Sequence, residues 1–437
     1  MSTIAKVLGR RVWDSRGRPT VEAEIVTDGG AVGRAIAPAG ASKGAHEALE
    51  LRDGGSTLGG YGVDRAVANV AERIAPALRG MQVEDQGGID ATLVDLDGTA
   101  ERRSLGANAM IAVSMATAHA AAAEAGVPLW RHLAAGKTRS VLPLPEIQIF
   151  GGGAHAAGRI DIQDLMIVCP GASSIAQALL WTAEVYRAAG LLMADAGRIA
   201  GVADEGGWWP VFDGNEEALE MLLRAIERAG FVPGEQVAIS LDVAASEFGR
   251  DGRYRLARDG TERDTDGMIE LLGRWIERYP ILSIEDPLAE DDAAGLLAFT
   301  RAYGDRVQIV GDDFLVTDAA RVRAAAQSGT CNCVLVKPNQ RGTLSETLEC
   351  WRAARAYGWG AIVSARSGET EDVTICHLAV GWDVPQLKVG SFARSERMAK
   401  WNELLRIEEA IGGGARFAGR RPFETLPQRP ESSSASA

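Results

Sequence analysis

The sequence has few of the residues that build disulfide frameworks or soft-metal sites. Its five cysteines are scattered, odd in number and without a Cys-x-x-Cys pair, so neither a disulfide framework nor a cysteine zinc site is expected. It has no run of about 18 apolar residues, which argues against a membrane-spanning helix. The first residues also lack the apolar segment of a signal peptide. We therefore expect a protein of the reducing cytoplasm.

The sequence also has fewer basic residues than acidic ones. The chain of 437 residues has 46 Lys and Arg against 59 Asp and Glu, a formal net charge of −13. Nucleic-acid contacts need a basic face, so this balance argues against a nucleic-acid partner. Hydrophobic residues (46%) and charged residues (24%) stand in the proportions of a soluble globular protein. The composition predicts a cytoplasmic enzyme without a membrane or nucleic-acid partner.

The first part of the chain, residues 1–140, has the pattern of a small α+β domain. Segments 4–13 and 20–27 alternate apolar and polar residues, which predicts a hairpin of an antiparallel sheet. Helical patterns follow over 64–80 and from 105 to about 125, where Gly and Pro end the second one.

From residue 141 the pattern changes to short apolar runs separated by helical stretches. Six runs stand out, and each ends on or beside a polar or charged residue: 237–241, 281–284, 307–310, 333–336, 361–363 and 386–387. Such alternation indicates a parallel α/β barrel or a doubly wound sheet. Because barrel enzymes carry their chemistry at the carboxyl ends of the strands, the polar run ends favour the barrel. We expect it over 141–425, followed by a disordered Pro/Ser/Ala-rich tail over 426–437.

Acidic residues end three successive strand candidates: Asp242, Glu285 and Asp312. In a barrel these carboxylates would meet on one rim and repel one another unless a cation lay between them. Oxygen ligands without His or Cys suit Mg²⁺. The alternative is three unrelated helix caps or solvated loop acids. It is less favoured because three equivalent strand ends are involved.

Two later strand candidates end on lysines, Lys337 and Lys388. A lysine beside a dication and a second lysine is expected to have a lowered pKa, because both neighbours disfavour its charged form. A deprotonated lysine is the kind of general base that removes a proton from carbon. The alternative is a surface lysine lying over apolar neighbours, but both lysines share the strand-end position of the acids.

A series of motifs is spread along the chain from about residue 3 to 425. They are Asp14-Ser15-Arg16-Gly17, Gly40-Ala41-Ser42, Glu47-Ala48-Leu49-Glu50-Leu51-Arg52-Asp53-Gly54, Leu105-Gly106-Ala107-Asn108-Ala109, Asp204-Glu205-Gly206-Gly207, Ser283-Ile284-Glu285-Asp286-Pro287, Gly311-Asp312-Asp313, Ser367-Gly368-Glu369-Thr370-Glu371-Asp372 and Arg394-Ser395-Glu396-Arg397. Together they resemble those of enolase (phosphopyruvate hydratase). The resemblance implies an α+β capping domain on an eight-stranded α/β barrel of the TIM type, assembled as a homodimer or homo-octamer. It also implies a hydro-lyase acting on a small anionic substrate like phosphoglycerate.

The same resemblance implies a cofactor and a role for each matching residue. Two Mg²⁺ ions per active site are implied, one held by Asp242, Glu285 and Asp312 and one bound at the phosphoryl group with help from Ser42. The implied catalytic residues are the base Lys337 at C2, the acid Glu205 at C3, Asp164 as its support, and Lys388 beside the substrate carboxylate. Further substrate contacts are implied for His155, Gln163, Arg366 and Ser367, the last two at the phosphoryl group.

Some active-site positions differ from the family pattern. Ala365 stands where the family has a histidine, Lys43 where it has a threonine, and Asp164 where it has a glutamate. The lost imidazole opens space at the phosphoryl end and Lys43 adds positive charge there, which would suit a larger and more anionic group at C2. We therefore expect a specialised member that dehydrates a phosphonate or phosphinate analogue of 2-phosphoglycerate, as in the formation of carboxyphosphonoenolpyruvate.

Three alternatives remain at this point. An ordinary glycolytic enolase would have the same catalytic residues and turn over 2-phosphoglycerate. A sugar-acid dehydratase or racemase is less favoured, because such enzymes use a Lys-x-Lys pair or a His-Asp dyad as bases, and we expect no such dyad at a strand end from the five histidines. A retired enolase with a binding or structural role would not need the acid and base, so the presence of Lys337 and Glu205 counts against it.

Overall fold

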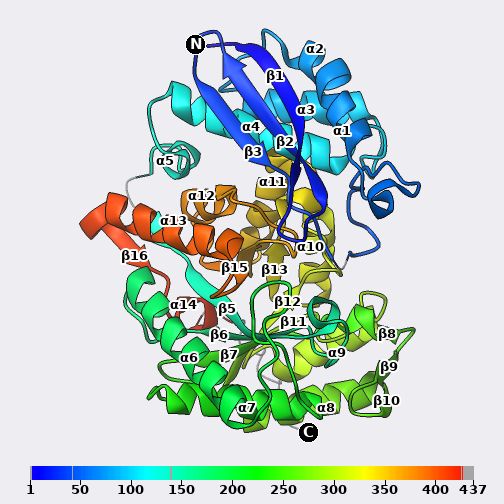
Figure 1. Ribbon diagram of the computed structural model, residues 1–437, viewed down its shortest axis with the longest axis vertical. Coiled ribbons are helices and arrows are strands. Elements are labelled where there is room, and N and C mark those ends of the chain that lie inside the picture. The colour runs from blue at the N-terminus through cyan, green and yellow to red at the C-terminus, as the bar shows by residue number, and fades with distance from the viewer. Residues whose placement is uncertain (1, 42, 138–139, 425, 427–437) are drawn as a thin grey trace, which may run out of the picture.

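The chain folds into two units, seen in a computed structural model that describes residues 2–41, 43–137, 140–424 and 426. The N-terminal unit, blue to cyan in Figure 1, sits on one end of a closed barrel. The tail predicted over 426–437 lies outside the described residues except for Leu426. Within the described ranges, the helices are too short or too polar to cross a membrane.

An antiparallel sheet forms one layer of the N-terminal unit. Its strands β1 (Ile4–Trp13), β2 (Pro19–Thr27) and β3 (Val32–Ile36) lie in the order β1-β2-β3, which confirms the hairpin predicted over 4–13 and 20–27. Val21, Ala23 and Ile25 are fully buried. The sheet packs against the helix α4 (Ala107–Glu124).

Helix α4 lies very close to β3. It is rich in alanine, a strong helix former whose small side chain allows a short distance between backbones. A Cβ atom added to Gly33 would lie 2.1 Å from the Ala120 nitrogen, so only glycine fits there. The other helices of this unit are α1 (Asp64–Asn69), α2 (Ala75–Leu78), α3 (Gln86–Asp97) and α5 (Leu129–Leu133). A π turn over Val70–Ile74 separates α1 from α2, so the helix predicted over 64–80 is not uniform.

Eight strands close the barrel in the order β11-β12-β13-β14-β15-β5-β6-β7. They are β5 (Leu144–Gly151), β6 (Asp164–Val168), β7 (Ala238–Asp242), β11 (Ile281–Glu285), β12 (Gln308–Gly311), β13 (Cys333–Val336), β14 (Gly360–Ser364) and β15 (Gln386–Ser391). The six predicted runs correspond to β7 and β11–β15, so the predicted barrel is confirmed.

The barrel is not wholly parallel, which corrects the sequence prediction. Strand β6 runs antiparallel to both β5 and β7. Its first residue, Asp164, is therefore paired with Asp242, the last residue of β7. The reversal brings the start of β6 to the rim where the parallel strands end.

Helices and two small sheets surround the barrel. The helices are α6 (Ile175–Asp195), α7 (Asn215–Arg228), α8 (Thr265–Arg278), α9 (Ala293–Tyr303), α10 (Ala319–Ser328), α11 (Leu344–Ala356), α12 (Thr374–Gly381), α13 (Ser395–Ile411) and α14 (Arg421–Glu424). The remaining strands are β4 (Ser140–Leu142), paired with β16 (Ala415–Phe417), and a meander of β8 (Gly249–Arg250), β9 (Arg253–Leu256) and β10 (Thr261–Asp264).

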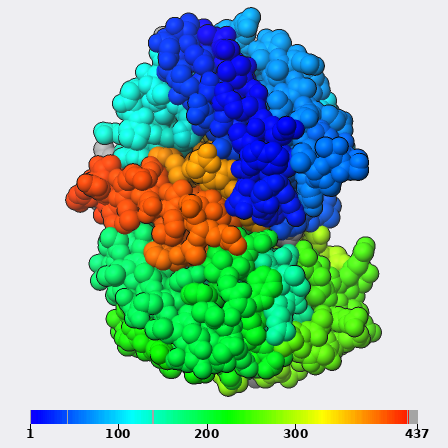
Figure 2. Space-filling view, viewed as in Figure 1, coloured from blue at the N-terminus to red at the C-terminus, as the bar shows by residue number. Residues whose placement is uncertain are grey.

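The two units are joined by buried polar contacts. The Leu344 amide donates to Ser114 Oγ (3.0 Å) and Ser345 Oγ donates to Asp90 Oδ2 (2.6 Å), which links the start of α11 to α3 and α4. Figure 2 shows the N-terminal unit seated directly against the barrel on the visible face. The capping unit and the barrel rim are therefore held in a fixed relation.

Candidate active site

A small cavity of about 20 Å³ lies at the carboxyl-end rim of the barrel. Nine of the residues predicted from the sequence line it together: His155, Gln163, Asp164, Glu205, Asp242, Lys337, Arg366, Ser367 and Lys388. They come from the ends of β7, β13 and β14, from β15, from the start of β6 and from the loops that carry His155 and Glu205. The barrel rim thus gathers acids, cations and an imidazole from distant parts of the sequence.

Lys388 lies between the carboxylates of two neighbouring strands. Its Nζ donates to Asp242 Oδ2 at 2.8 Å and to Glu285 Oε2 at 2.7 Å, and lies 3.5 Å from Asp164 Oδ2. Burial alone would lower the pKa of Lys388, but Asp242 and Glu285 outweigh it and raise the pKa well above its ordinary value. Lys388 is therefore a firmly charged ammonium group, suited to stabilising an anion.

Lys337 is paired with the carboxylate of Asp312. Its Nζ donates to Asp312 Oδ2, and burial, which would lower the pKa, is outweighed by that carboxylate. The pKa of Lys337 is raised, whereas the sequence predicted a lowered one. The lowered pKa depends on a dication beside the lysine, which would offset the carboxylate of Asp312, and it stays a prediction.

The predicted magnesium ligands offer oxygen atoms that suit a hard cation. Glu285 is buried beside Asp242, and in the part of the chain that the structure describes its Oε1 has no hydrogen-bond partner. Burial, followed by repulsion from Asp242, raises the pKa of Glu285 well above its usual range. Asp312 Oδ1 accepts a hydrogen bond from Gln340 Nε2 at 2.9 Å. These buried carboxylates are oxygen donors of the kind that Mg²⁺ prefers, and Lys388 and Lys337 pair with them here.

A second acidic group adjoins Asp312. Oxygen atoms of Asp286, Asp312 and Asp313 lie within 4.8 Å of one another. Asp286 accepts hydrogen bonds from the Asp312 amide (2.8 Å) and the Asp313 amide (2.9 Å). Both carboxylate oxygens of Asp286 thus hold the turn after β12, which fixes the direction in which Asp312 leaves its strand.

His155 lies between two of the predicted catalytic carboxyl groups, and its pairing with Asp164 at the start of β6 corrects the expectation that no His-Asp dyad stands at a strand end. Its Nδ1 is 2.9 Å from Asp164 Oδ1, and its Nε2 is 3.6 Å from Glu205 Oε1 and 3.1 Å from Ser367 Oγ. Burial lowers its pKa, but Asp164 and Glu205 outweigh this and raise the pKa to about 9. His155 is therefore an imidazolium at neutral pH, and it lowers the pKa of the buried Asp164.

Arg366 presents its guanidinium at the predicted phosphoryl end. Glu47 faces it with both oxygens, Oε2 at 3.0 Å from Nη1 and Oε1 at 3.2 Å from Nη2. Nη1 also donates to Asn339 Oδ1 at 3.0 Å. The Arg366 amide donates to Glu369 Oε1 at 3.0 Å. A guanidinium held in this forked geometry can recognise a carboxylate or a phosphoryl group.

Of the remaining predicted substrate contacts, Lys43 does not line the cavity. Ser42 lies outside the described residues. The Lys43 Nζ is 2.9 Å from Glu50 Oε2, and 46% of the Lys43 side chain is exposed. Glu50 is buried and is also paired with Arg52 at 3.2 Å. The positive charge of Lys43 is therefore paired with the carboxylate of Glu50. Ala365 does line the cavity.

Sequence reasoning missed two residues that contact the predicted ones. Gln148 on β5 donates to Asp164 Oδ1 and accepts from the Gly207 amide at 2.8 Å, so it joins the His155 group to the Glu205 loop. Glu47 was quoted only as part of a motif, yet it is the ion-pair partner of Arg366. The signal for Gln148 was available, because Glu146 and Gln148 alternate with apolar residues over 144–150, which indicates that both side chains face one side of a strand.

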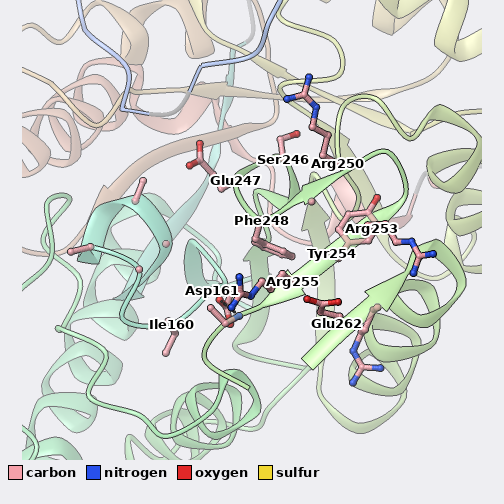
Figure 3. A pocket seen from close by; sticks show the side chains of 17 residues that line it. Ile160, Asp161, Ser246, Glu247, Phe248, Arg250, Arg253, Tyr254, Arg255 and Glu262 are labelled. Atoms are coloured by element: carbon pink, nitrogen blue, oxygen red, sulfur yellow. Dashed lines mark hydrogen bonds between the residues drawn. The ribbon is translucent and has the colours of Figure 1, made fainter. Parts of the chain in front are cut away.

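A much larger cavity, about 1030 Å³, lies beside this site, between the turn Gly153–Ala156 and the β8–β10 meander. Figure 3 shows that Arg250, Arg253 and Arg255, which line it, point in different directions. Its charged groups do not converge on one point as those of the small cavity do. The candidate active site is therefore the small cavity at the barrel rim.

Two protein-family models match the chain, one for each unit. The model described as "Enolase, N-terminal domain" matches residues 4–133. The model described as "Enolase, C-terminal TIM barrel domain" matches residues 139–426.

Proposed function

The chain belongs to the enolase family, and on that premise we propose a magnesium-dependent hydro-lyase that removes water from 2-phosphoglycerate or from a phosphonate or phosphinate analogue of it. Family membership supports an enolase-type lyase, and the metal, the substrate and the role of each residue are parts of the proposal. The observation that carries it is the meeting of Lys337, Glu205 and Lys388 in one buried cavity.

The charges of the site suit the abstraction of a proton next to a carboxylate. Such a proton is very weakly acidic, because its loss leaves a doubly charged intermediate. Lys388, whose pKa is raised well above its ordinary value, would face that charge where it develops. Lys337 is the proposed base, and it reaches the cavity from the end of β13.

The residues that would hold a metal are Asp242, Glu285 and Asp312. When bound, Mg²⁺ would act as a Lewis acid that stabilises negative charge on the substrate carboxylate. Its binding would also neutralise the carboxylate of Asp312, which now raises the pKa of Lys337. A second Mg²⁺ with a contact from Ser42 remains part of the proposal.

The acid side of the site is built around His155. Hydroxide is a poor leaving group, so Glu205 is proposed to donate a proton as the C3 oxygen departs. The imidazolium of His155 contacts both Glu205 and Asp164 and holds their carboxyl groups at one side of the cavity. Asp164 is itself held by Gln148, which keeps this group in place from β5.

The group at C2 of the substrate is the specific part of the proposal. Ala365 leaves only a methyl group at the cavity wall, which supports a substrate larger than phosphoglycerate, as for a carboxyphosphonoenolpyruvate synthase. Ordinary enolase activity is the second candidate. It is favoured by the pairing of Lys43 with Glu50, which leaves less positive charge for a more anionic group.

Turnover of the two substrates separates these candidates. Purified protein with Mg²⁺ is given 2-phosphoglycerate or its phosphinate analogue, and enolpyruvate formation is followed by ultraviolet absorbance, with Lys337→Ala as the inactive control. The specialised function predicts faster turnover of the analogue. It also predicts that Ala365→His with Lys43→Thr shifts preference toward 2-phosphoglycerate. Turnover of 2-phosphoglycerate in the ordinary range, roughly 1–1000 per second, would establish the second candidate instead.

We also propose a cytoplasmic homodimer or homo-octamer, as is usual for the family. Light scattering on the purified protein would distinguish these assemblies from a monomer, whose detection would overturn this part of the proposal.

A further inference from the structure

Helix α13 carries two cations that are completely removed from solvent. Arg397 and Lys400 have no exposed surface, and they share the buried face of the helix with Trp401 and Leu404. Their spacing of three residues places both side chains on the same side of the helix. Burying a charged group costs several kcal/mol unless its surroundings compensate it. We therefore expect hydrogen bonds or ion pairs that compensate the charge of both side chains.

Arg397 binds the backbone that presents the phosphoryl-end residues. Its Nη1 donates to the carbonyl oxygen of Arg366 at 2.7 Å and of Val389 at 2.8 Å. Its Nη2 donates to the carbonyl oxygen of Ser367 at 2.6 Å. One guanidinium thus fixes two successive peptide groups, those of Arg366 and Ser367, and ties them to strand β15.

Lys400 holds the following turn in the same way. Its Nζ donates to the carbonyl oxygen of Thr370 at 2.6 Å and lies 2.8 Å from Glu369 Oε2. The other oxygen of Glu369 accepts the Arg366 amide at 3.0 Å. A chain of contacts therefore runs from Lys400 through Glu369 to the backbone of Arg366.

The two cations differ in how their charge is balanced. Lys400 has the carboxylate of Glu369 beside it. Among the described residues, Arg397 donates its hydrogen bonds to carbonyl oxygens and its Nε makes none. That Nε lies 3.6 Å from Glu396 Oε1, a longer ion pair than that of Lys400. Arg397 therefore places a loosely paired cation against the segment that carries Arg366 and Ser367.

We propose that Arg397 and Lys400 are positioning residues for anion recognition: they hold the segment 366–370 so that Arg366 and Ser367 face the phosphoryl group, and Arg397 adds positive charge beside it. This inference rests on the proposed function, in which Arg366 and Ser367 bind that group. Neither cation lines the cavity, so both act through the residues that they hold.

Phosphate binding measures this role without turnover. Inorganic phosphate is titrated into the Mg²⁺-loaded full-length protein by calorimetry, and Mg²⁺ affinity is measured separately. We expect Arg397→Met to weaken phosphate binding on the order of 10-fold to 100-fold, as the outer partners of a site commonly do. Arg397→Lys, which keeps the charge, should restore part of the affinity. Mg²⁺ affinity should change little in either variant.

Matched variants separate positioning from general stability. Arg406→Gln changes an exposed arginine of the same helix, paired only with Glu403 in the described contacts, and should leave phosphate affinity unchanged. Lys400→Met is the second test of the segment if Arg397→Met does not fold. Variants that lower the melting temperature but bind phosphate as tightly as the wild type would overturn the inference. A wild-type protein that binds Mg²⁺ but no phosphate would instead overturn the proposed function on which it rests.

Discussion

Acid is expected to destabilise this protein through two imidazoles buried where the units meet. His119 on α4 and His377 on α12 have ring centroids 6.2 Å apart, with the rings nearly perpendicular at 87°. His119 Nε2 is 2.8 Å from Thr374 Oγ1. His377 Nδ1 has no hydrogen-bond partner among the described residues, and its Nε2 lies 3.4 Å from Glu403 Oε1. Burial, helped by His119, lowers the pKa of His377 to about 4. Burial also lowers the pKa of His119.

The sign and size of the effect follow from linkage. In the unfolded chain His377 has the ordinary pKa of about 6.5 and takes up a proton below it, whereas the folded chain does not until about pH 4. The free energy of unfolding therefore falls as the pH drops from about 6.5 to 4. From His377 alone the loss between pH 7.5 and 5 is about 2 kcal/mol.

Urea denaturation at pH 7.5 and 5.0, followed by tryptophan fluorescence, measures this loss. We expect the wild type to lose about 2 kcal/mol more than His377→Gln between the two pH values, because the glutamine does not titrate. His46→Gln removes an exposed histidine and should behave like the wild type. Equal losses in the wild type and His377→Gln would refute the reasoning.

Three further predictions concern the site. Because the pKa of His155 is raised to about 9, its stabilising contribution is complete below pH 6.5 and is lost as the pH rises through 9. The melting temperature of the wild type should therefore fall more between pH 7 and 10 than that of His155→Gln, and parallel curves would contradict this. Asp312→Asn should weaken Mg²⁺ binding at least about tenfold in calorimetry by removing a proposed ligand charge, while Asp266→Asn on an exposed helix turn should not. Gln148→Leu should lower kcat by about 10-fold to 100-fold with a smaller change in KM, since Gln148 holds Asp164, and an unchanged kcat would rule out that role.

Much of the fold and of the candidate site could be predicted because each short apolar run ends on or beside a polar or charged residue. Asp242 and Glu285 end short apolar runs, Asp312 follows another, and the barrel brings all three to one rim near Lys337 and Lys388. The apolar pattern of one strand is enough to place such a residue on the rim, because the carboxyl ends of all parallel barrel strands meet there.

The remaining features depend on partners far away in the sequence. The reversed direction of β6 could not be seen, because an antiparallel and a parallel buried strand have similar apolar runs. The raised pKa of Lys337 depends on its distance from Asp312, which no spacing reveals. Arg397 and Lys400 stand on an amphipathic-looking helix, where charged residues usually face solvent. Their burial depends on contacts with the 366–370 segment, which the pattern of the helix itself does not reveal.

The proposed roles of Lys337 as the base and Glu205 as the acid are tested most directly by hydrogen exchange at C2 of the substrate. The variants Glu205→Gln and Lys337→Met are incubated with Mg²⁺ and substrate in deuterated water, and loss of the C2 proton is followed by NMR. The account predicts that Glu205→Gln exchanges this proton while forming little enolpyruvate, because the base is intact and the acid is missing. Lys337→Met should do neither. Exchange by Lys337→Met at the wild-type rate would contradict the account.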